Sequence, residues 1–174
     1  KKAEAYLEYL GKHDTLTKLR NRTFYIEELN RLSRKGPWPV SVLAIDLNGL
    51  KNAHDSNGHA AGDALLRRAG EVLSKAVAEP ACAARIGGDE FMVLMPGTDR
   101  AGAERLKEHI DSMLELNNQF YPGQPLSLAV GIATCQQAHE LELACQEADR
   151  EMYAAKAHYY ATHHIERRRN RDGA

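Results

Sequence analysis

Apolar residues recur along this chain with two different spacings, which separate helical segments from strands. A spacing of three or four residues is typical of a helix with one buried face. The segments with this spacing are residues 1–12, 22–35, 60–78, 100–117 and 139–161. Short, nearly continuous apolar runs are typical of strands. These runs occupy residues 40–46, 82–86, 91–95 and 126–133. The stretch 46–59, rich in Asn, Asp and Gly, is not expected to stay regular for long.

The order of these elements indicates the fold class. From residue 22 onward it is helix, strand, helix, strand, strand, helix, strand, helix, which contains the β-α-β-β-α-β order of ferredoxin-like domains. We therefore predict an α+β domain with a ferredoxin-like core, in which helices surround a mainly antiparallel central sheet. The first strand and the middle hairpin are expected to be neighbours in that sheet.

Composition argues against several classes of protein. The chain has 174 residues, enough for one domain, and its formal net charge of −1 gives no general attraction to nucleic acid or to an anionic membrane. Its longest apolar runs, such as residues 40–45, are too short to span a bilayer. Cys82, Cys135 and Cys145 fit the spacing of neither a zinc site nor a disulfide framework, so we expect free thiols in a reducing cytoplasm.

Two acids interrupt the apolar run RIGGDEFMVLM at residues 85–95. Asp89 and Glu90 follow twin glycines at the predicted hairpin, and Asp46 ends the predicted neighbouring strand. Three carboxylates brought together would repel one another strongly unless a cation lies between them. Mg²⁺ takes oxygen ligands of this kind. An ordinary exposed hairpin turn would also explain the glycines and acids, but the addition of Asp46 favours a metal site.

Four strings in the chain resemble one family, in the same order and at similar spacing. GGDEF at 87–91 is the signature of the GGDEF domain, the catalytic domain of diguanylate cyclases. The other strings are HDTLTKLRNR at 13–22, DLNGLKNAHDSNGHAAGD at 46–63 and EADREMYAAK at 147–156. The resemblance covers the chain from about residue 12 to about residue 156.

The resemblance implies an activity and a palm-type fold like that of polymerases and adenylate cyclases. Members condense two GTP into cyclic di-GMP and release two pyrophosphates, with Mg²⁺ or Mn²⁺ as cofactor. Each domain binds one GTP, and a homodimer brings two sites face to face. We expect the cyclase domain at residues 13–161, the end of an upstream connecting helix at 1–12, and a polar tail or linker at 162–174. Residues 1–12 could equally be a helix packed on its own domain.

The family's catalytic residues can be carried over where the motifs match. Asp46, Asp89, Glu90 and the backbone carbonyl of Leu47 are expected to hold the metal. Asp89 would also help to deprotonate the attacking 3′-hydroxyl. Lys51 would neutralise phosphate charge as the transition state forms, so Asp89, Glu90 and Lys51 form the expected catalytic set.

Substrate contacts are expected on both sides of these acids. The turn Asn48–Gly49–Leu50–Lys51 would offer backbone N–H groups to phosphate oxygens, and Lys156 would reach the triphosphate. Without the motifs, Lys51 and Lys156 would be interpreted as ordinary surface lysines.

The expected base pocket contains a departure from the family. Asp63 would accept hydrogen bonds from guanine N1–H and N2–H₂. His54 stands where the family has an asparagine, and it cannot reproduce the paired donor and acceptor of an amide. His59 is expected either to line the pocket or to brace the loop.

Other departures affect the phosphates and the product. Tyr160 stands where the family has a phosphate-binding arginine, and Asn48 replaces the second Asp of its D-x-D string. Many members also carry an inhibitory R-x-x-D site for cyclic di-GMP just before the signature. The matching positions here are Ala78 and Ala81, so we expect no product inhibition through that site.

Three hypotheses for function remain open at this stage. The first is an active diguanylate cyclase, favoured because Asp46, Asp89, Glu90 and Lys51 are all present. The second is a catalytically silent GTP-binding domain that regulates a larger signalling protein, and the third is a different nucleotide substrate such as ATP. The expected partners are GTP, a second copy of the domain and an upstream sensory domain, with a downstream domain left open and without nucleic acid. The domain is expected in the cytoplasm, even if the full-length protein is attached to a membrane.

Overall fold

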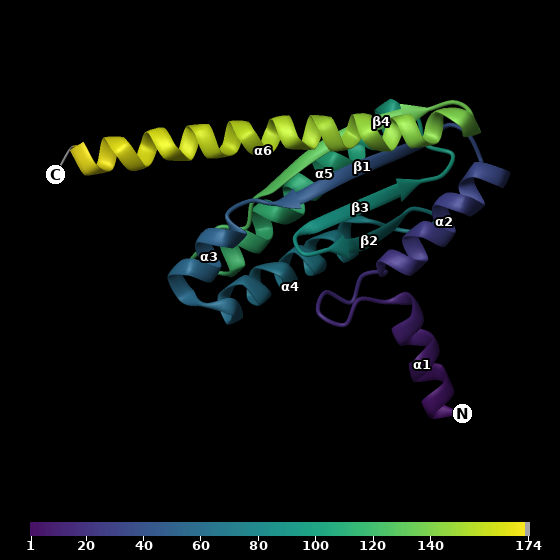
Figure 1. Ribbon diagram of the computed structural model, residues 1–174, viewed down its shortest axis with the longest axis horizontal. Helices are drawn as coiled ribbons and strands as arrows, with labels where there is room; N and C mark the ends of the chain where they lie inside the picture. Colours follow the sequence, from purple (N-terminus) through teal and green to yellow (C-terminus); the bar gives the residue numbers. More distant parts are fainter. Residues whose placement is uncertain (173–174) are drawn as a thin grey trace.

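The computed structural model describes the backbone of residues 1–172 and the side chains of residues 1–56 and 58–163. In this part of the chain, one sheet lies between two layers of helices (Figure 1). The helices are α1 (Lys2–Lys12), α2 (Arg22–Lys35), α3 (Leu50–Asn57), α4 (His59–Ala76), α5 (Arg100–Phe120) and α6 (Leu141–Asp172). The strands are β1 (Val40–Leu47), β2 (Cys82–Gly87), β3 (Glu90–Met95) and β4 (Leu128–Cys135). A short 3₁₀ helix, η1 (Ala138–Glu140), precedes α6.

The sheet confirms the predicted α+β class and the β-α-β-β-α-β order. Its strands follow the spatial order β2-β3-β1-β4, and every neighbouring pair is antiparallel. The helices α3 and α4 connect β1 to β2, and α5 connects β3 to β4. The first strand and the middle hairpin are adjacent in the sheet, as predicted, because β1 pairs with β3 from Ser41 to Asp46.

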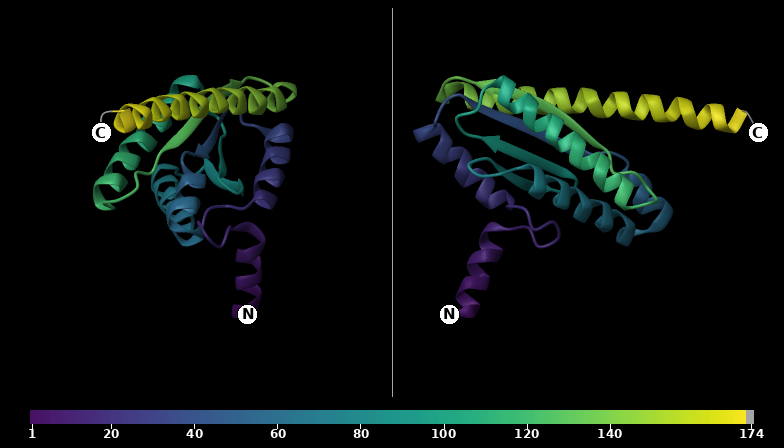
Figure 2. Two further views of the ribbon diagram at one scale, coloured as in Figure 1. Left: turned by 60° about the vertical axis from the view of Figure 1, so that its left-hand side comes forward. Right: turned by 180° about the vertical axis from the view of Figure 1, so that it is seen from behind.

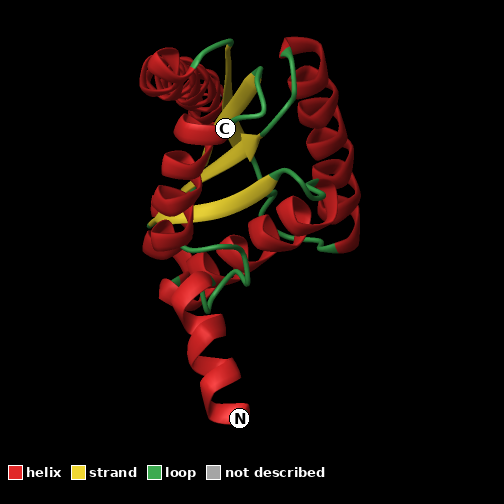
Figure 3. Cartoon of the chain, turned by 90° about the vertical axis from the view of Figure 1, so that its right-hand side faces the viewer, coloured by secondary structure: helices red, strands yellow, loops and turns green. Residues whose placement is uncertain are grey.

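The alternating side chains of β1 divide the core into two layers. Leu43, Ile45 and Leu47 pack with α4 and α5 on one face, whereas Val42 and Ala44 pack with α2 and α6 on the other. Figure 2 shows α4 and α5 lying together over one side, and Figure 3 shows helices on both sides of the strands. Because both faces are covered, β1 is buried along its whole length.

The helix α3 corrects the expectation of an irregular loop after β1. Residues 50–57 form a helix between Gly49 and Gly58, both of which have positive φ angles. Its sequence has little apolar periodicity, but Ala53 is fully buried and Leu50 packs against the core. Tertiary packing therefore stabilises a helix that local sequence hardly favours.

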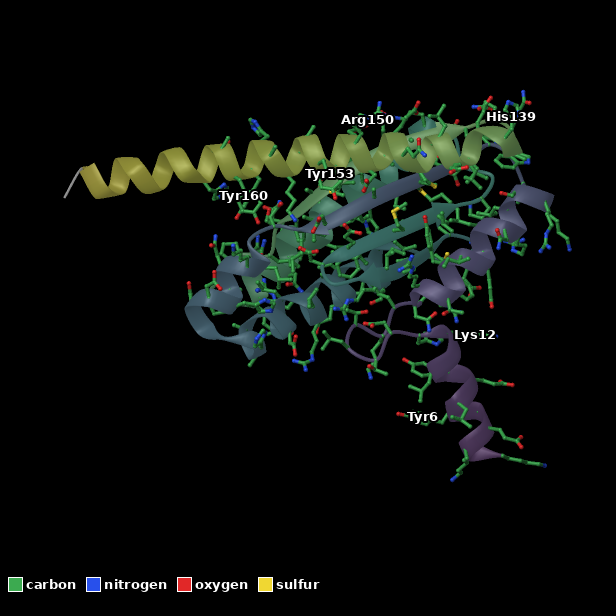
Figure 4. All side chains as sticks on the ribbon, viewed as in Figure 1. Tyr6, Lys12, His139, Arg150, Tyr153 and Tyr160 are labelled. Atoms are coloured by element: carbon green, nitrogen blue, oxygen red, sulfur yellow. The ribbon has the colours of Figure 1, made fainter. Side chains whose placement is uncertain are left out.

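The two ends of the chain also differ from a simple reading of the pattern. The helix α6 was expected to end at residue 161 but continues to Asp172, and the side chains of residues 164–174 lie outside the described part. The helix α1 buries none of its residues and points away from the sheet (Figures 1 and 2). Tyr6, labelled in Figure 4, and Leu7 are 61% and 66% exposed, whereas Leu10 on the same face is partly buried.

Two further expectations concern the membrane and the thiols. No helix within the described residues is both long and apolar enough to cross a membrane. Cys82, Cys135 and Cys145 are free thiols, of which Cys135 is buried and the other two are partly buried. Burial raises the pKa of both Cys82 and Cys135 to about 11, so these thiols are protonated near neutral pH.

A glycine contact places α6 on the sheet. A Cβ at Gly131 in β4 would overlap the carbonyl oxygen of Ala148 and lie 2.5 Å from the backbone nitrogen of Met152. Since both atoms belong to the backbone of α6, no side chain can move aside to make room. The distance between α6 and β4 therefore depends on the absence of a side chain at Gly131.

We predict that Gly131→Ala lowers the free energy of unfolding by about 1–3 kcal/mol, because α6 must shift away from β4 to admit the methyl group. The urea midpoint of the circular dichroism signal measures this loss. Gly11→Ala is the matched control, since a Cβ there meets nothing within 4 Å and alanine favours the helix. An unchanged midpoint in Gly131→Ala, or an equal loss in both variants, would contradict the prediction.

Candidate functional site

The candidate site lies where β1 ends beside the hairpin of β2 and β3. Asp46 is paired with Glu90 across β1 and β3, and the backbone N–H of Leu47 donates to the carbonyl of Asp89 at 3.0 Å. Side chains alternate along a strand. Asp46 therefore points to the same face as Ala44, which is the face covered by α6.

Lys156 on α6 holds two of the predicted carboxylates together. Its Nζ lies 3.0 Å from Oδ2 of Asp46 and 3.5 Å from Oδ2 of Asp89. Asp46 is only 3% exposed, so its charge is shielded from water. The crowding of carboxylates was expected to require a cation, and in this structure the ammonium group of Lys156 meets that requirement.

The titration of these groups reflects burial and mutual charge. Burial raises the pKa of Asp46 to about 7; Lys156 opposes this rise, and the neighbouring Asp89 adds to it. Burial lowers the pKa of Lys156, but the carboxylates of Asp46 and Asp89 more than offset this, so the Lys156 pKa is raised. Lys156 therefore stays charged at the pH where Asp46 exchanges its proton.

The geometry around Asp46 fits a hard divalent cation. Its second oxygen, Oδ1, is buried and makes no hydrogen bond to the described residues. A buried carboxylate oxygen without a partner is costly, and a metal ion would satisfy it. Within residues 1–163, however, no three His, Cys, Asp or Glu side chains form a ready cluster for a metal. The ligands would therefore have to gather when Lys156 moves off them.

Glu90, unlike Asp46 and Asp89, lines a cavity and forms no salt bridge to the described residues. It lines a cavity of about 330 Å³ between α2, α6 and the sheet, together with Glu142 and Asp149. This cavity is acidic on that side, and it leaves room for a ligand next to the carboxylates.

Hydrogen bonds to Ser127, just before β4, fix the turn that follows β1. The backbone N–H of Asn48 donates to the carbonyl of Ser127 at 2.8 Å, and its side-chain Nδ2 donates to Ser127 Oγ at 3.0 Å. Gly49 then adopts a left-handed conformation with φ of 78° and begins α3. Because the first N–H groups of a helix lack partners within it, this turn presents backbone donors.

Leu50 and Lys51 occupy the first turn of α3 with different exposures. The side chain of Leu50 packs against the core, so only its backbone is available to a ligand. The side chain of Lys51 is exposed. It was expected to act with Asp89 and Glu90, and its exposed position leaves it free to turn toward a bound phosphate.

The residues expected to bind the base lie on α3 and α4. The rings of His54 and His59 are 4.9 Å apart, and the missing side chain of Gly62 makes room for the His54 ring. The Nε2 atom of His54 is buried there without a hydrogen bond to the described residues. Asp63 is partly exposed on the next position of α4. His59 thus contacts the ring of His54, and its expected role, lining the pocket or bracing the loop, stays a prediction.

The family profile described as "Diguanylate cyclase, GGDEF domain" matches residues 11–160. The chain belongs to the GGDEF domain family. Among curated relatives, the diguanylate cyclase DgcS of Shewanella oneidensis is 34% identical over 148 residues, which cover 83% of this chain and 49% of that protein. An uncharacterized signaling protein of Caulobacter vibrioides is 36% identical over 163 residues, covering 88% of this chain and 20% of that protein. The GGDEF domain therefore spans half or less of these relatives.

Solved structures confirm the fold of this GGDEF domain. The coiled coil and GGDEF domain of DgcB from Caulobacter crescentus, in complex with c-di-GMP, superposes with a TM-score of 0.80 over 90% of this chain and 86% of that chain, at 22% identity. The GGDEF domain of PA1120 from Pseudomonas aeruginosa gives a TM-score of 0.70 at 32% identity, over 84% of this chain and 89% of that chain. The GGDEF fold is thus confirmed for this chain.

One support of the GGDEF site was missed in the sequence. Arg68 is buried; its Nε donates to Asn117 Oδ1 at 2.9 Å and its Nη1 donates to the carbonyl of Gln124 at 2.9 Å. Gln124 Nε2 in turn donates to the carbonyl of Gly49 at 3.4 Å. A signal was available, because Arg68 interrupts the apolar stripe of the helix predicted over residues 60–78.

We predict that Asp46 in the ligand-free domain titrates with a pKa of about 7. Because this folded-state pKa lies above the ordinary 3.8, protonated Asp46 contributes stability that is fully present below about pH 4 and is lost as the pH rises through about 7. The side-chain ¹³C shift of Asp46 across this range measures the pKa, with Asp46→Asn to assign the signal. Lys156→Met should raise the pKa further, since it removes the ammonium that lowers it. Titration near pH 4 in the parent would show that burial does not dominate.

Proposed function

We propose that this GGDEF domain is an active diguanylate cyclase that condenses two GTP into cyclic di-GMP and two pyrophosphates. The observation that carries the proposal is the buried carboxylate of Asp46, which has an unpartnered oxygen and faces Asp89 beside a turn of backbone donors. A domain that only bound a partner protein would have no physical need to bury this charge.

Asp46, Asp89, Glu90 and the carbonyl of Leu47 would hold Mg²⁺ or Mn²⁺. A bound divalent cation supplies charge neutralisation for phosphoryl transfer. The donor set is made of oxygens, which suits these ions. Loading the site requires Lys156 to leave Asp46 and Asp89, since it now occupies the space between their Oδ2 atoms.

The freed ammonium of Lys156 then has the triphosphate as its natural partner. Lys51, exposed at the start of α3, would turn toward the same phosphates, and the N–H groups of Leu50 and Lys51 would donate to their oxygens. Asp89 would accept the proton of the attacking 3′-hydroxyl. The new bond forms between that oxygen and the α-phosphorus, and the bond to pyrophosphate breaks on the opposite side.

Asp63 would read the base by accepting from guanine N1–H and N2–H₂. His54 faces Gly62 through its buried Nε2, with His59 against its ring. This arrangement offers the base no amide, so we expect weaker discrimination by His54 than by an asparagine. It is also the observation that favours the alternatives, a silent nucleotide-binding domain or a domain that accepts ATP.

Catalysis in this proposal requires two copies of the domain. Each copy holds one nucleotide, so the 3′-hydroxyl on one copy must reach the α-phosphorus on the other. In the full-length protein, neighbouring sensory or output domains would set how often two copies meet. The rate per domain of the isolated chain should therefore rise with protein concentration.

The deciding experiment incubates concentrated protein with GTP and Mg²⁺, then Mn²⁺, and separates the nucleotides by chromatography. We expect cyclic di-GMP from the parent and a rate at least about 100-fold lower from Asp89→Asn, which keeps the shape but loses the base. Asp111→Asn is the matched control, because Asp111 is an exposed carboxylate paired with Lys107 on α5. Calorimetry with GTP accompanies the assay. Binding without product would favour the silent domain.

A further expectation concerns product inhibition. Ala78 and Ala81 lie in a tight turn, closed by a hydrogen bond of 3.1 Å from the N–H of Ala81 to the carbonyl of Ala78. Neither methyl group can pair with a phosphate or a guanine. Added cyclic di-GMP should therefore leave the initial rate unchanged at saturating GTP. The double variant Ala78→Arg with Ala81→Asp should become inhibitable. Strong inhibition of the parent that disappears when this turn is altered would refute the expectation.

A further inference from the structure

Tyr160 extends from α6 to the turn that begins α3. Its hydroxyl oxygen accepts a hydrogen bond of 3.1 Å from the backbone N–H of Gly49. The side chain is labelled in Figure 4, where it hangs from α6 toward α3. A missing phosphate contact was expected at this position. The structure instead places a neutral hydroxyl directly on the turn that is proposed to bind phosphate.

The peptide groups of Gly49 are held from two sides. Tyr160 takes the N–H, and Gln124 donates to the carbonyl at 3.4 Å. Arg68 fixes Gln124 in turn through its backbone carbonyl. Gly49 has a left-handed conformation, and no side-chain cap hydrogen bond forms at the start of α3. The Gly49 carbonyl also accepts from the N–H of Ala53 within α3 at 3.0 Å, so Tyr160 adds the contact on the N–H side of this residue.

One face of α6 connects this turn with the carboxylates. Lys156 and Tyr160 are one helical turn apart, a spacing that places two side chains on the same side of a helix. Lys156 contacts Asp46 and Asp89, whereas Tyr160 contacts Gly49. A nucleotide bound between the carboxylates and the turn would therefore lie next to both Lys156 and Tyr160.

We propose that Tyr160 is a phosphate-positioning residue, an assignment that rests on the proposed function. A phenol is both acceptor and donor. While its oxygen accepts from Gly49, its proton is available to a phosphate oxygen. Tyr160 thus orients the turn and adds one neutral donor to it. A neutral donor binds an anion less strongly than a cation does, but here it acts from a position that the Gly49 hydrogen bond fixes.

Tyr160→Phe tests the assignment, because it removes only the hydroxyl. Calorimetry with α,β-methylene GTP and with guanosine, both in the presence of Mg²⁺, compares the parent, Tyr160→Phe and Tyr6→Phe. The dissociation constant of the triphosphate analogue should rise about 5- to 10-fold in Tyr160→Phe, as for one lost hydrogen bond. Guanosine affinity should not change. Tyr6→Phe removes an exposed hydroxyl on α1 and should behave as the parent does.

A second measurement needs no nucleotide. Amide hydrogen exchange at Gly49 in the ligand-free protein should be faster in Tyr160→Phe than in the parent, whereas it should be unchanged in Tyr6→Phe. Unchanged exchange at Gly49 would overturn the contact. Equal or tighter binding of the analogue by Tyr160→Phe, or an equal loss for guanosine, would overturn the phosphate role. If the parent binds no analogue at all, the proposed function fails and this role with it, while the exchange result still reports on the contact.

Discussion

The burial of Asp46 against the underside of α6 constrains the arrangement of everything around it. A carboxylate that is 3% exposed needs a compensating charge or a proton. Lys156 provides the charge from α6, and it reaches Asp89 with the same ammonium group. The C-terminal end of β1, the β2–β3 hairpin and the middle of α6 must therefore lie close together. Loss of the contact from α6 would leave the buried Asp46 carboxylate without this ionic partner.

The position of α6 in turn depends on how closely its backbone packs against β4. Gly131 admits the backbone of α6 at Ala148 and Met152, and Lys156 follows Met152 by one helical turn. A shift of α6 away from β4 would move Lys156 away from the carboxylates. A small residue in β4 thus controls the electrostatics of the site, although it contacts none of the polar groups. Asp46 lies on the same face of β1 as Val42 and Ala44, which belong to the core layer under α6. The site is therefore the polar edge of that core layer.

The strands and the placement of the three carboxylates could be predicted from the sequence, because both follow from the local pattern of apolar residues. The apolar runs located the strands, and their order placed Asp46 next to the hairpin of Asp89 and Glu90. The contacts of Lys156 and Tyr160 could not be predicted in this way. Each joins residues about a hundred positions apart, and each depends on the register of α6 against the sheet. The helix α3 was missed for a related reason, since burial of Ala53 rather than local periodicity stabilises it.

Several polar groups of the site find their partners on α6, the last helix. An ammonium lies between the carboxylates, and a hydroxyl oxygen lies on an N–H of the turn. A metal would offer Asp46 and Asp89 the same group that Lys156 offers them now, a cation, and a nucleotide would offer phosphate oxygens to the N–H groups of Leu50 and Lys51. Binding in the proposed function would then exchange contacts rather than simply add them, and affinity would follow the difference between the two sets. In this scheme only the Lys156 contact is exchanged: Lys156 moves from Asp46 and Asp89 to the phosphates, while the Tyr160 oxygen stays on the N–H of Gly49 and its proton is donated to a phosphate oxygen.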